Sequence, residues 1–115
     1  MMLVGLSLLV APMTPHPVPH RIPAVWQTVA DCESGEWDAT GEPIPGTRDW
    51  SYDDGRYEGG LNFAPATWDW LAPATFPPSA SDATPWQQVR VARRVLTVQG
   101  WDAWPVCSRK TGVAP

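Results

Sequence analysis

Apolar residues at helical spacing predict a first helix in residues 24–35. Val25, Val29 and Cys32 fall on one face of this segment, because residues three or four apart lie one above the other on a helix. Gly35 follows the last of them and is a typical helix end. We therefore expect the helix to run from residue 24 to about residue 35.

A second and stronger helix is predicted for residues 85–99. Thr84 is a candidate N-cap, Pro85 suits the first helical position, and Gln87 completes the sequence of a capping box. Gly100 is the expected end of the helix. One face then carries apolar and polar residues at helical spacing, namely Val89, Ala92, Leu96 and Gln99.

The stretch between these two helices is rich in turn formers. Residues 65–71 fit a short helix that starts at Pro65, and residues 36–56 contain the glycines and prolines of turns and of a short hairpin. Residues 57–63 are typical of a short strand or tight turn, with paired glycines that permit unusual dihedral angles. The pattern thus predicts three helices, with turns and a short β-hairpin between the first two.

The two ends of the chain differ from its middle. Residues 1–11 are apolar and uncharged, too short to span a bilayer but of the length of a secretory signal core. Residues 12–23 are rich in proline, which favours an extended tether. We therefore expect a folded domain in residues 24–110 and a tail in residues 111–115. Whether the apolar run is a cleaved signal, a remnant of one or a short tail stays open.

Composition narrows the classes of function. The chain has 115 residues with 8 Trp, 14 Pro and a net charge of −4. It is too short for a Rossmann enzyme or a multi-pass membrane protein, and an acidic chain without clustered Lys and Arg is no general binder of nucleic acid. His16 and His20 lie in the proline-rich segment, where no helix can hold both on one metal, so we expect no metal and no cofactor. Many tryptophans suit stacking on flat neutral ligands such as sugars.

The two cysteines, Cys32 and Cys107, allow two interpretations. Cys32 as a nucleophile needs a neighbouring base, but both histidines of the chain lie outside the expected domain. A disulfide would join the two ends of a small domain and stabilise it strongly. We favour the disulfide, which implies an oxidising compartment outside the cytoplasm.

Glu33 is the carboxylate with the most suggestive position, at the end of the first predicted helix beside Cys32. Taken alone, an ordinary surface or capping acid is the alternative. Six aromatic residues are candidates for a groove wall near it: Trp37, Trp50, Tyr57, Trp68, Trp101 and Trp104. A carboxyl group held against aromatic rings loses hydration, which raises its pKa. Such a group can be protonated near neutral pH and donate a proton to a glycosidic oxygen, as the lysozyme glutamate does.

Four short strings of residues carry a resemblance to a known family. They are C-E-S-G at residues 32–35, Y-E-G-G-L-N-F at residues 57–63, T-W at residues 67–68 and Q-G-W-D-A-W-P-V-C at residues 99–107. Together they resemble the catalytic domain of resuscitation-promoting factors, small lysozyme-like peptidoglycan hydrolases also called transglycosylase-like domains. The first and last strings are very specific as a pair, and the resemblance covers about residues 24–110.

This resemblance implies an α+β, lysozyme-like fold with about three helices around a short β-hairpin. It also implies a role for individual residues. Glu33 matches the single catalytic glutamate of the family, and Cys32 and Cys107 match its disulfide pair. The residues that the resemblance assigns to the glycan groove or its aromatic wall are Tyr57, Thr67, Gln99, Trp50 and Trp68.

The chain departs from the family pattern at three places. About fourteen residues, Glu36–Asp49, intervene before Trp50, which we align with a family tryptophan; Trp37 is the alternative. Asn62 stands where Gln is usual, and Ala64 replaces an acid that some members have. The inserted segment is expected to lengthen a lip of the cleft.

The implied function is cleavage of the β-1,4 bond between N-acetylmuramic acid and N-acetylglucosamine, by hydrolysis or with an anhydro product. The alternatives are a non-catalytic glycan-binding module and a structural surface or virion protein. The resemblance further implies peptidoglycan strands as partner, a monomer without stable membrane insertion, and an extracellular, cell-wall-associated location of bacterial or phage origin. A partner endopeptidase and the biological purpose are left open.

Overall fold

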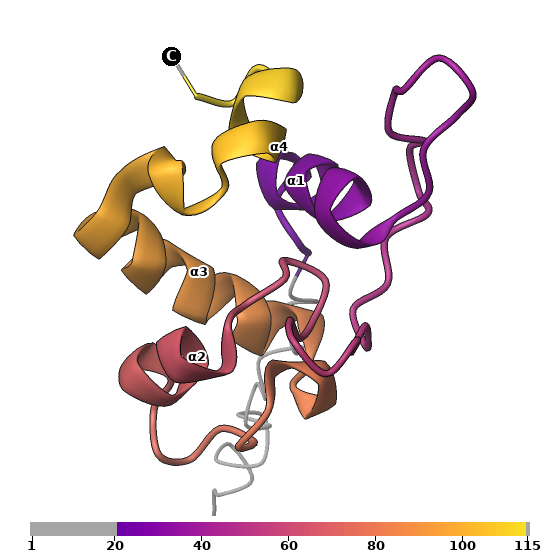
Figure 1. The fold of residues 1–115 in the computed structure, drawn as a ribbon. Coiled ribbons are helices and arrows are strands. Elements are labelled where there is room, and N and C mark those ends of the chain that lie inside the picture. The colour runs from indigo at the N-terminus through magenta and orange to yellow at the C-terminus, as the bar shows by residue number, and fades with distance from the viewer. Residues whose placement is uncertain (1–20, 115) are drawn as a thin grey trace, which may run out of the picture.

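Helices dominate the computed structural model, which describes residues 21–114 (Figure 1). Their order along the chain is α1 (Ala24–Ser34), α2 (Pro65–Leu71), the 3-10 turn η2 (Ala80–Asp82), α3 (Pro85–Gln99), the 3-10 turn η3 (Gly100–Ala103) and α4 (Pro105–Lys110). The three predicted helices are confirmed, and α4 is an addition that the sequence pattern did not predict. The expectations for residues 1–20 lie outside the described residues. No helix in the described part of the chain has the length and apolar character needed to cross a membrane.

Helix α3 begins as its sequence predicts. The Thr84 hydroxyl accepts a hydrogen bond from the Gln87 backbone N–H at 3.1 Å, and the Gln87 side chain accepts one from the Thr84 N–H at 3.0 Å. This capping box satisfies two N–H groups that lack partners within the helix. The buried face differs from the predicted one, because Val91 and Val95 are buried whereas Gln99 is exposed.

The core lies between α1, α3 and the C-terminal segment. Three indole rings form its end near α4: Trp26 lies 5.3 Å from both Trp101 and Trp104, measured between ring centroids. The Trp104 N–H donates to the Leu61 carbonyl at 2.9 Å, so this buried indole has a polar partner. Cys32 of α1 and Cys107 of α4 form the disulfide, with 5.7 Å between their Cα atoms. The predicted disulfide is therefore confirmed.

The predicted β-hairpin is wrong, and with it the α+β class. The part of the chain that the structure describes contains no strand and only three isolated bridges: Trp37–Pro43, Asp53–Glu58 and Glu58–Phe63. Aspartate side chains accept hydrogen bonds from backbone N–H groups that would otherwise pair with a neighbouring strand. The Asp54 carboxylate, for example, accepts from the N–H groups of Arg56 and Tyr57 at 2.8 and 2.7 Å. The domain is mainly helical.

The inserted segment, residues 36–49, is called the arm. Figure 1 shows it as a purple loop that leaves the end of α1 and projects from the helices. Two pairs of residues hold it closed on itself: the Asp38 N–H donates to the Glu42 carbonyl and the Ile44 N–H to the Glu36 carbonyl, each at 2.8 Å. The arm is thus a defined turn structure with its own backbone hydrogen bonds.

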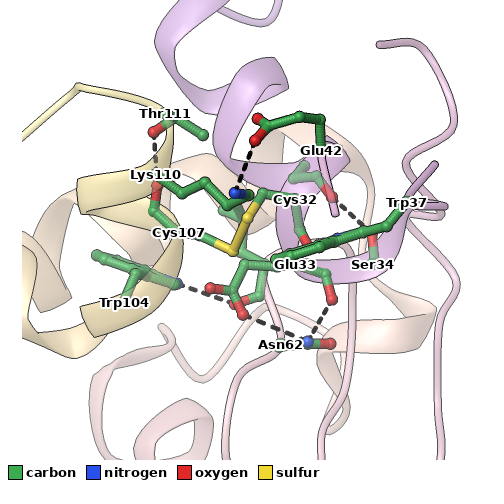
Figure 2. The surroundings of a disulfide bond; sticks show 12 residues. Cys32, Glu33, Ser34, Trp37, Glu42, Asn62, Trp104, Cys107, Lys110 and Thr111 are labelled. Atoms are coloured by element: carbon green, nitrogen blue, oxygen red, sulfur yellow. Dashed lines mark hydrogen bonds and ion pairs between the residues drawn. A yellow bond between two sulfur atoms is a disulfide. The ribbon is translucent and has the colours of Figure 1, made fainter. Parts of the chain in front are cut away.

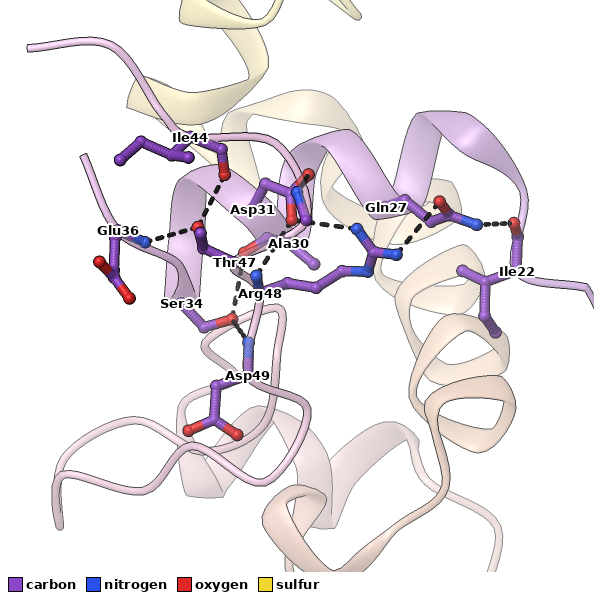
Figure 3. A network of polar contacts seen from close by, with 11 residues as sticks. Ile22, Gln27, Ala30, Asp31, Ser34, Glu36, Ile44, Thr47, Arg48 and Asp49 are labelled. Atoms are coloured by element: carbon purple, nitrogen blue, oxygen red, sulfur yellow. Dashed lines mark hydrogen bonds and ion pairs between the residues drawn. The ribbon is translucent and has the colours of Figure 1, made fainter. Parts of the chain in front are cut away.

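Polar side chains of α1 fix the base of the arm (Figure 3). The Asp31 carboxylate accepts from the Gly46 N–H at 3.0 Å and from both the N–H and the guanidinium of Arg48 at 3.1 Å. The Ser34 hydroxyl accepts from the Asp49 N–H at 2.9 Å. Asp31 is buried, and hydrogen bonds to a buried carboxylate are stronger than neutral ones. The arm therefore returns to the helix from which it starts.

A fully buried glutamine joins the 57–63 turn to α3. The Gln88 amide oxygen accepts from the Gly60 N–H at 2.8 Å, and its NH₂ group donates to the Trp50 and Ala83 carbonyls at 2.7 and 3.1 Å. Gly59, with φ +78°, packs directly against this amide. Gly59 is required here by close approach as well as by its dihedral angle, and Gly60 by the close approach of the Trp50 ring.

We expect Gly59→Ala to destabilise the domain by roughly 2–3 kcal/mol. A Cβ at this position would lie 2.5 Å from the Gln88 amide oxygen, on a backbone that disfavours side chains. Gly55→Ala is the matched control, because Gly55 has φ +81° but nothing within 4 Å of its Cβ position. Urea unfolding of both variants measures the difference, and equal losses would contradict the steric argument.

Candidate active site

Glu33 lies at the C-terminal end of α1, on the wall of a cavity of about 400 Å³. The disulfide and the start of α4 form one side of this cavity, and the arm and the 57–63 turn supply the rest. Its lining residues are Cys32, Glu33, Trp37, Tyr57, Asn62, Ala103, Trp104, Pro105, Val106 and Cys107. A volume of this size fits a small-molecule or sugar ligand.

Asn62 is the polar partner of Glu33 (Figure 2). Its NH₂ group donates to the Glu33 backbone carbonyl at 2.6 Å and, more weakly, to the carboxylate at 3.4 Å. Asn62 has φ +51°, a left-handed conformation that Asn tolerates better than most residues. Burial raises the pKa of Glu33 above its ordinary value, and the Asn62 hydrogen bond lowers it by a smaller amount. The result is a carboxyl group that keeps its proton to higher pH than a free glutamate.

The raised pKa of Glu33 makes a prediction about stability against pH. A carboxyl group whose pKa is higher in the folded than in the unfolded chain stabilises the fold fully below its ordinary pKa of 4.5, and this stability is lost as pH rises through the folded-state pKa. We expect Glu33→Gln to melt at the same temperature as wild type near pH ~4 and at a higher temperature near pH ~7. Thermal melting of the two proteins over this range measures the difference, in which all other titrating groups cancel. A constant difference would contradict the burial of Glu33.

A second cavity, of about 120 Å³, adjoins the first. The two share the lining residues Tyr57, Asn62, Ala103 and Trp104, so together they form one groove. Thr67 of α2 and Gln99 of α3 line the second cavity. Three of the predicted groove residues, Tyr57, Thr67 and Gln99, are thus brought into this groove together with Glu33.

The structure does not bring Trp50 and Trp68 into the groove. Trp68 is 1% exposed, and its N–H donates to the Pro77 carbonyl at 2.8 Å. The Trp50 ring packs against the backbone of Gly60, where an added Cβ would approach it to 2.5 Å. Both tryptophans support the turn and the helix that carry groove residues, and we leave them out of the site.

A family sequence profile described as a transglycosylase-like domain matches residues 22–107. The chain belongs to this family. The match includes every residue of the groove and both cysteines, and it confirms the resemblance seen in the sequence strings.

The relatives of this transglycosylase-like domain include several resuscitation-promoting factors. The chain is 43% identical over 90 residues to resuscitation-promoting factor RpfC of Mycobacterium tuberculosis, covering 76% of the chain and 53% of that protein. It is 42% identical over 85 residues to RpfA of the same species and 38% identical over 89 residues to Rpf1 of Corynebacterium glutamicum. These alignments cover 73% and 76% of the chain, but only 18% and 40% of the two relatives. The chain therefore corresponds to one part of longer proteins.

Asn62 and Val106 are among the groove residues of the transglycosylase-like domain that the sequence did not indicate. Asn62 was noted only as a departure from the family pattern, and its contact with Glu33 depends on a turn that brings together residues 29 positions apart. Val106 was part of a matching string, but nothing in that string indicates that its side chain is 62% exposed at the cavity. The described residues contain no group of three or more His, Cys, Asp and Glu side chains that would hold a metal ion.

Proposed function

We propose that this domain cleaves the β-1,4 bond between N-acetylmuramic acid and N-acetylglucosamine in peptidoglycan, with Glu33 as its catalytic acid. The observation that carries the proposal is the position of Glu33, on the wall of an aromatic-lined groove where burial raises its pKa. A general acid works best when its pKa approaches the operating pH. Membership in the transglycosylase-like family supports this reading of the groove.

The proton path of the proposed reaction is short. Protonated Glu33 donates its proton to the glycosidic oxygen while the bond from that oxygen to the sugar C1 breaks. The resulting carboxylate then takes a proton from water, whose oxygen bonds to C1, or from the muramyl 6-hydroxyl, whose oxygen closes an anhydro ring. Either route returns Glu33 to its protonated form.

Glu33 works alone in this proposal. It is the only carboxylate among the residues that line the two cavities. The rule that relates the distance between two carboxylates to the stereochemistry of the product therefore has no second group to use. The charge that develops at C1 would be shared with the acetamido group of the substrate and with the Tyr57 and Trp104 rings of the groove wall.

The disulfide supports a place of action outside the cytoplasm. Cys32 and Cys107 are bonded to each other, and such bonds persist in oxidising compartments. Peptidoglycan lies in that environment, which agrees with a secreted, cell-wall-associated enzyme.

Mass spectrometry of the soluble products from purified peptidoglycan tests the proposal. Anhydromuropeptides would identify a lytic transglycosylase, and products with a reducing muramyl end would identify a hydrolase. Protein that sediments with peptidoglycan but releases no muropeptide would contradict the proposal in favour of a glycan-binding module.

A further inference from the structure

Exposed hydrophobic side chains gather at the groove. Six large hydrophobic residues are exposed among the described residues: Val25, Trp37, Tyr57, Trp70, Val98 and Val106. Three of them, Trp37, Tyr57 and Val106, line the same 400 Å³ cavity as Glu33. Exposed apolar surface that rims a cavity is a common feature of ligand-binding sites.

Trp37 differs from the other two because it belongs to the arm. Its side chain is 43% exposed, yet its N–H donates to the Cys32 carbonyl at 2.9 Å. The polar edge of the indole is therefore satisfied inside the protein, and what it presents to solvent is apolar ring surface. The Trp37 ring can therefore stack on a ligand without needing a further hydrogen-bond partner for its N–H.

Lys110 of α4 lies over one face of the Trp37 ring. The Lys110 ammonium lies 5.4 Å from the centroid of the Trp37 ring and forms an ion pair of 3.0 Å with Glu42 of the arm. In Figure 2, Lys110 and Asn62 lie on opposite sides of the Trp37 side chain. The cation covers the ring from one side, so the side toward the cavity is the one that stays available.

Contacts with α1 and α4 hold the arm, and with it Trp37, in place. Its base is fixed by Asp31 and Ser34 of α1, and its Glu42 forms an ion pair with Lys110 of α4. A ring that is held in place before binding loses little conformational entropy when a ligand packs against it. Trp37 is therefore a preorganised part of the groove wall.

We propose that Trp37 is a stacking platform for an N-acetylhexosamine ring of the glycan strand, so that the arm adds a sugar-binding position to the groove beside Glu33. A pyranose ring has an apolar face of C–H groups that matches the exposed indole face, and its hydroxyl and acetamido groups remain in water at the open rim. The proposal rests on the proposed function, from which it takes the class of ligand.

The test measures binding of the Glu33→Gln protein to purified peptidoglycan, because this background prevents cleavage during the measurement. Adding Trp37→Ala is expected to weaken binding on the order of tenfold, the range of an aromatic stacking contact. Trp37→Phe retains a stacking ring and is expected to restore most of that loss. Trp70→Ala is the matched control: Trp70 is 62% exposed on α2 but lines neither cavity of the groove, so binding should stay unchanged.

The outcomes separate this inference from the proposed function. Equal binding of the Trp37→Ala and Trp70→Ala proteins, both folded by circular dichroism, would overturn the platform even if Glu33 is required for cleavage. Weaker binding of Trp37→Ala in the Glu33→Gln background, together with no muropeptide release by the protein that retains Glu33, would support the platform and overturn the proposed cleavage. A Trp37→Phe protein as weak as Trp37→Ala would show that the N–H bond to Cys32 matters rather than the ring, and would also overturn the platform.

Discussion

Glu33→Gln is expected to lose about 10²- to 10⁴-fold or more of the muropeptide release from purified peptidoglycan, the range that a positioned general acid contributes. Glutamine keeps the size of the side chain, and its amide oxygen can still accept from Asn62, but it has no proton to give to the glycosidic oxygen. The loss should appear in the catalytic rate, with sedimentation on peptidoglycan retained. Mass spectrometry of soluble products at fixed enzyme concentration measures the rate.

Glu36→Gln is the matched control for this experiment. Glu36 is an exposed acid three residues after Glu33, and it does not line the groove. It undergoes the same chemical change at the same end of α1, so its activity should equal that of wild type. Wild-type product release by Glu33→Gln would remove Glu33 from the mechanism, and an equal loss in both variants would indicate a general effect of charge.

Replacing both Cys32 and Cys107 with Ala is expected to lower the free energy of unfolding by about 4 kcal/mol. The disulfide joins residues 75 positions apart, so it restricts most of the unfolded domain. Alanine is the appropriate replacement because both cysteines are 4% exposed and a serine hydroxyl would need a buried partner. A loss of this size is a large fraction of the stability of a small domain. Urea unfolding monitored by circular dichroism measures it.

Reduction of the wild-type protein gives an independent control for the disulfide. A reducing agent should lower the wild-type unfolding midpoint toward that of the double variant and leave the double variant unchanged. A double variant within about 1 kcal/mol of oxidised wild type would mean that packing between α1 and α4 holds the ends of the domain without the covalent bond.

Features that depend on neighbouring residues could be predicted from the sequence. The capping box of Thr84 and Gln87 is formed within one turn of chain, and so is the end of α1 at Gly35. The hairpin failed for an equally local reason, because the Asp54 side chain competes with a partner strand for backbone N–H groups. Helix α4 has only six residues, too few for hydrophobic periodicity to reveal it.

The sequence could not predict which tryptophans face the groove and which face the core. Trp37, Trp50 and Trp68 have the same side chain, and all three were candidates for the groove wall. Whether an indole faces a groove or the core is decided by contacts with distant segments: Trp68 reaches Pro77, Trp50 packs on Gly60, and Trp37 is held by Lys110.

The sequence by itself determined the family, the three longer helices, the cysteine pair and the identity of the candidate acid, because short strings of residues carry each of them. Only the tertiary structure decided what surrounds Glu33. Burial of a carboxyl group and its contact with Asn62 arise where α1, the 57–63 turn and α4 meet, and long-range packing sets their arrangement. For the same reason, only the tertiary structure shows that the inserted arm contributes Trp37 to the groove wall.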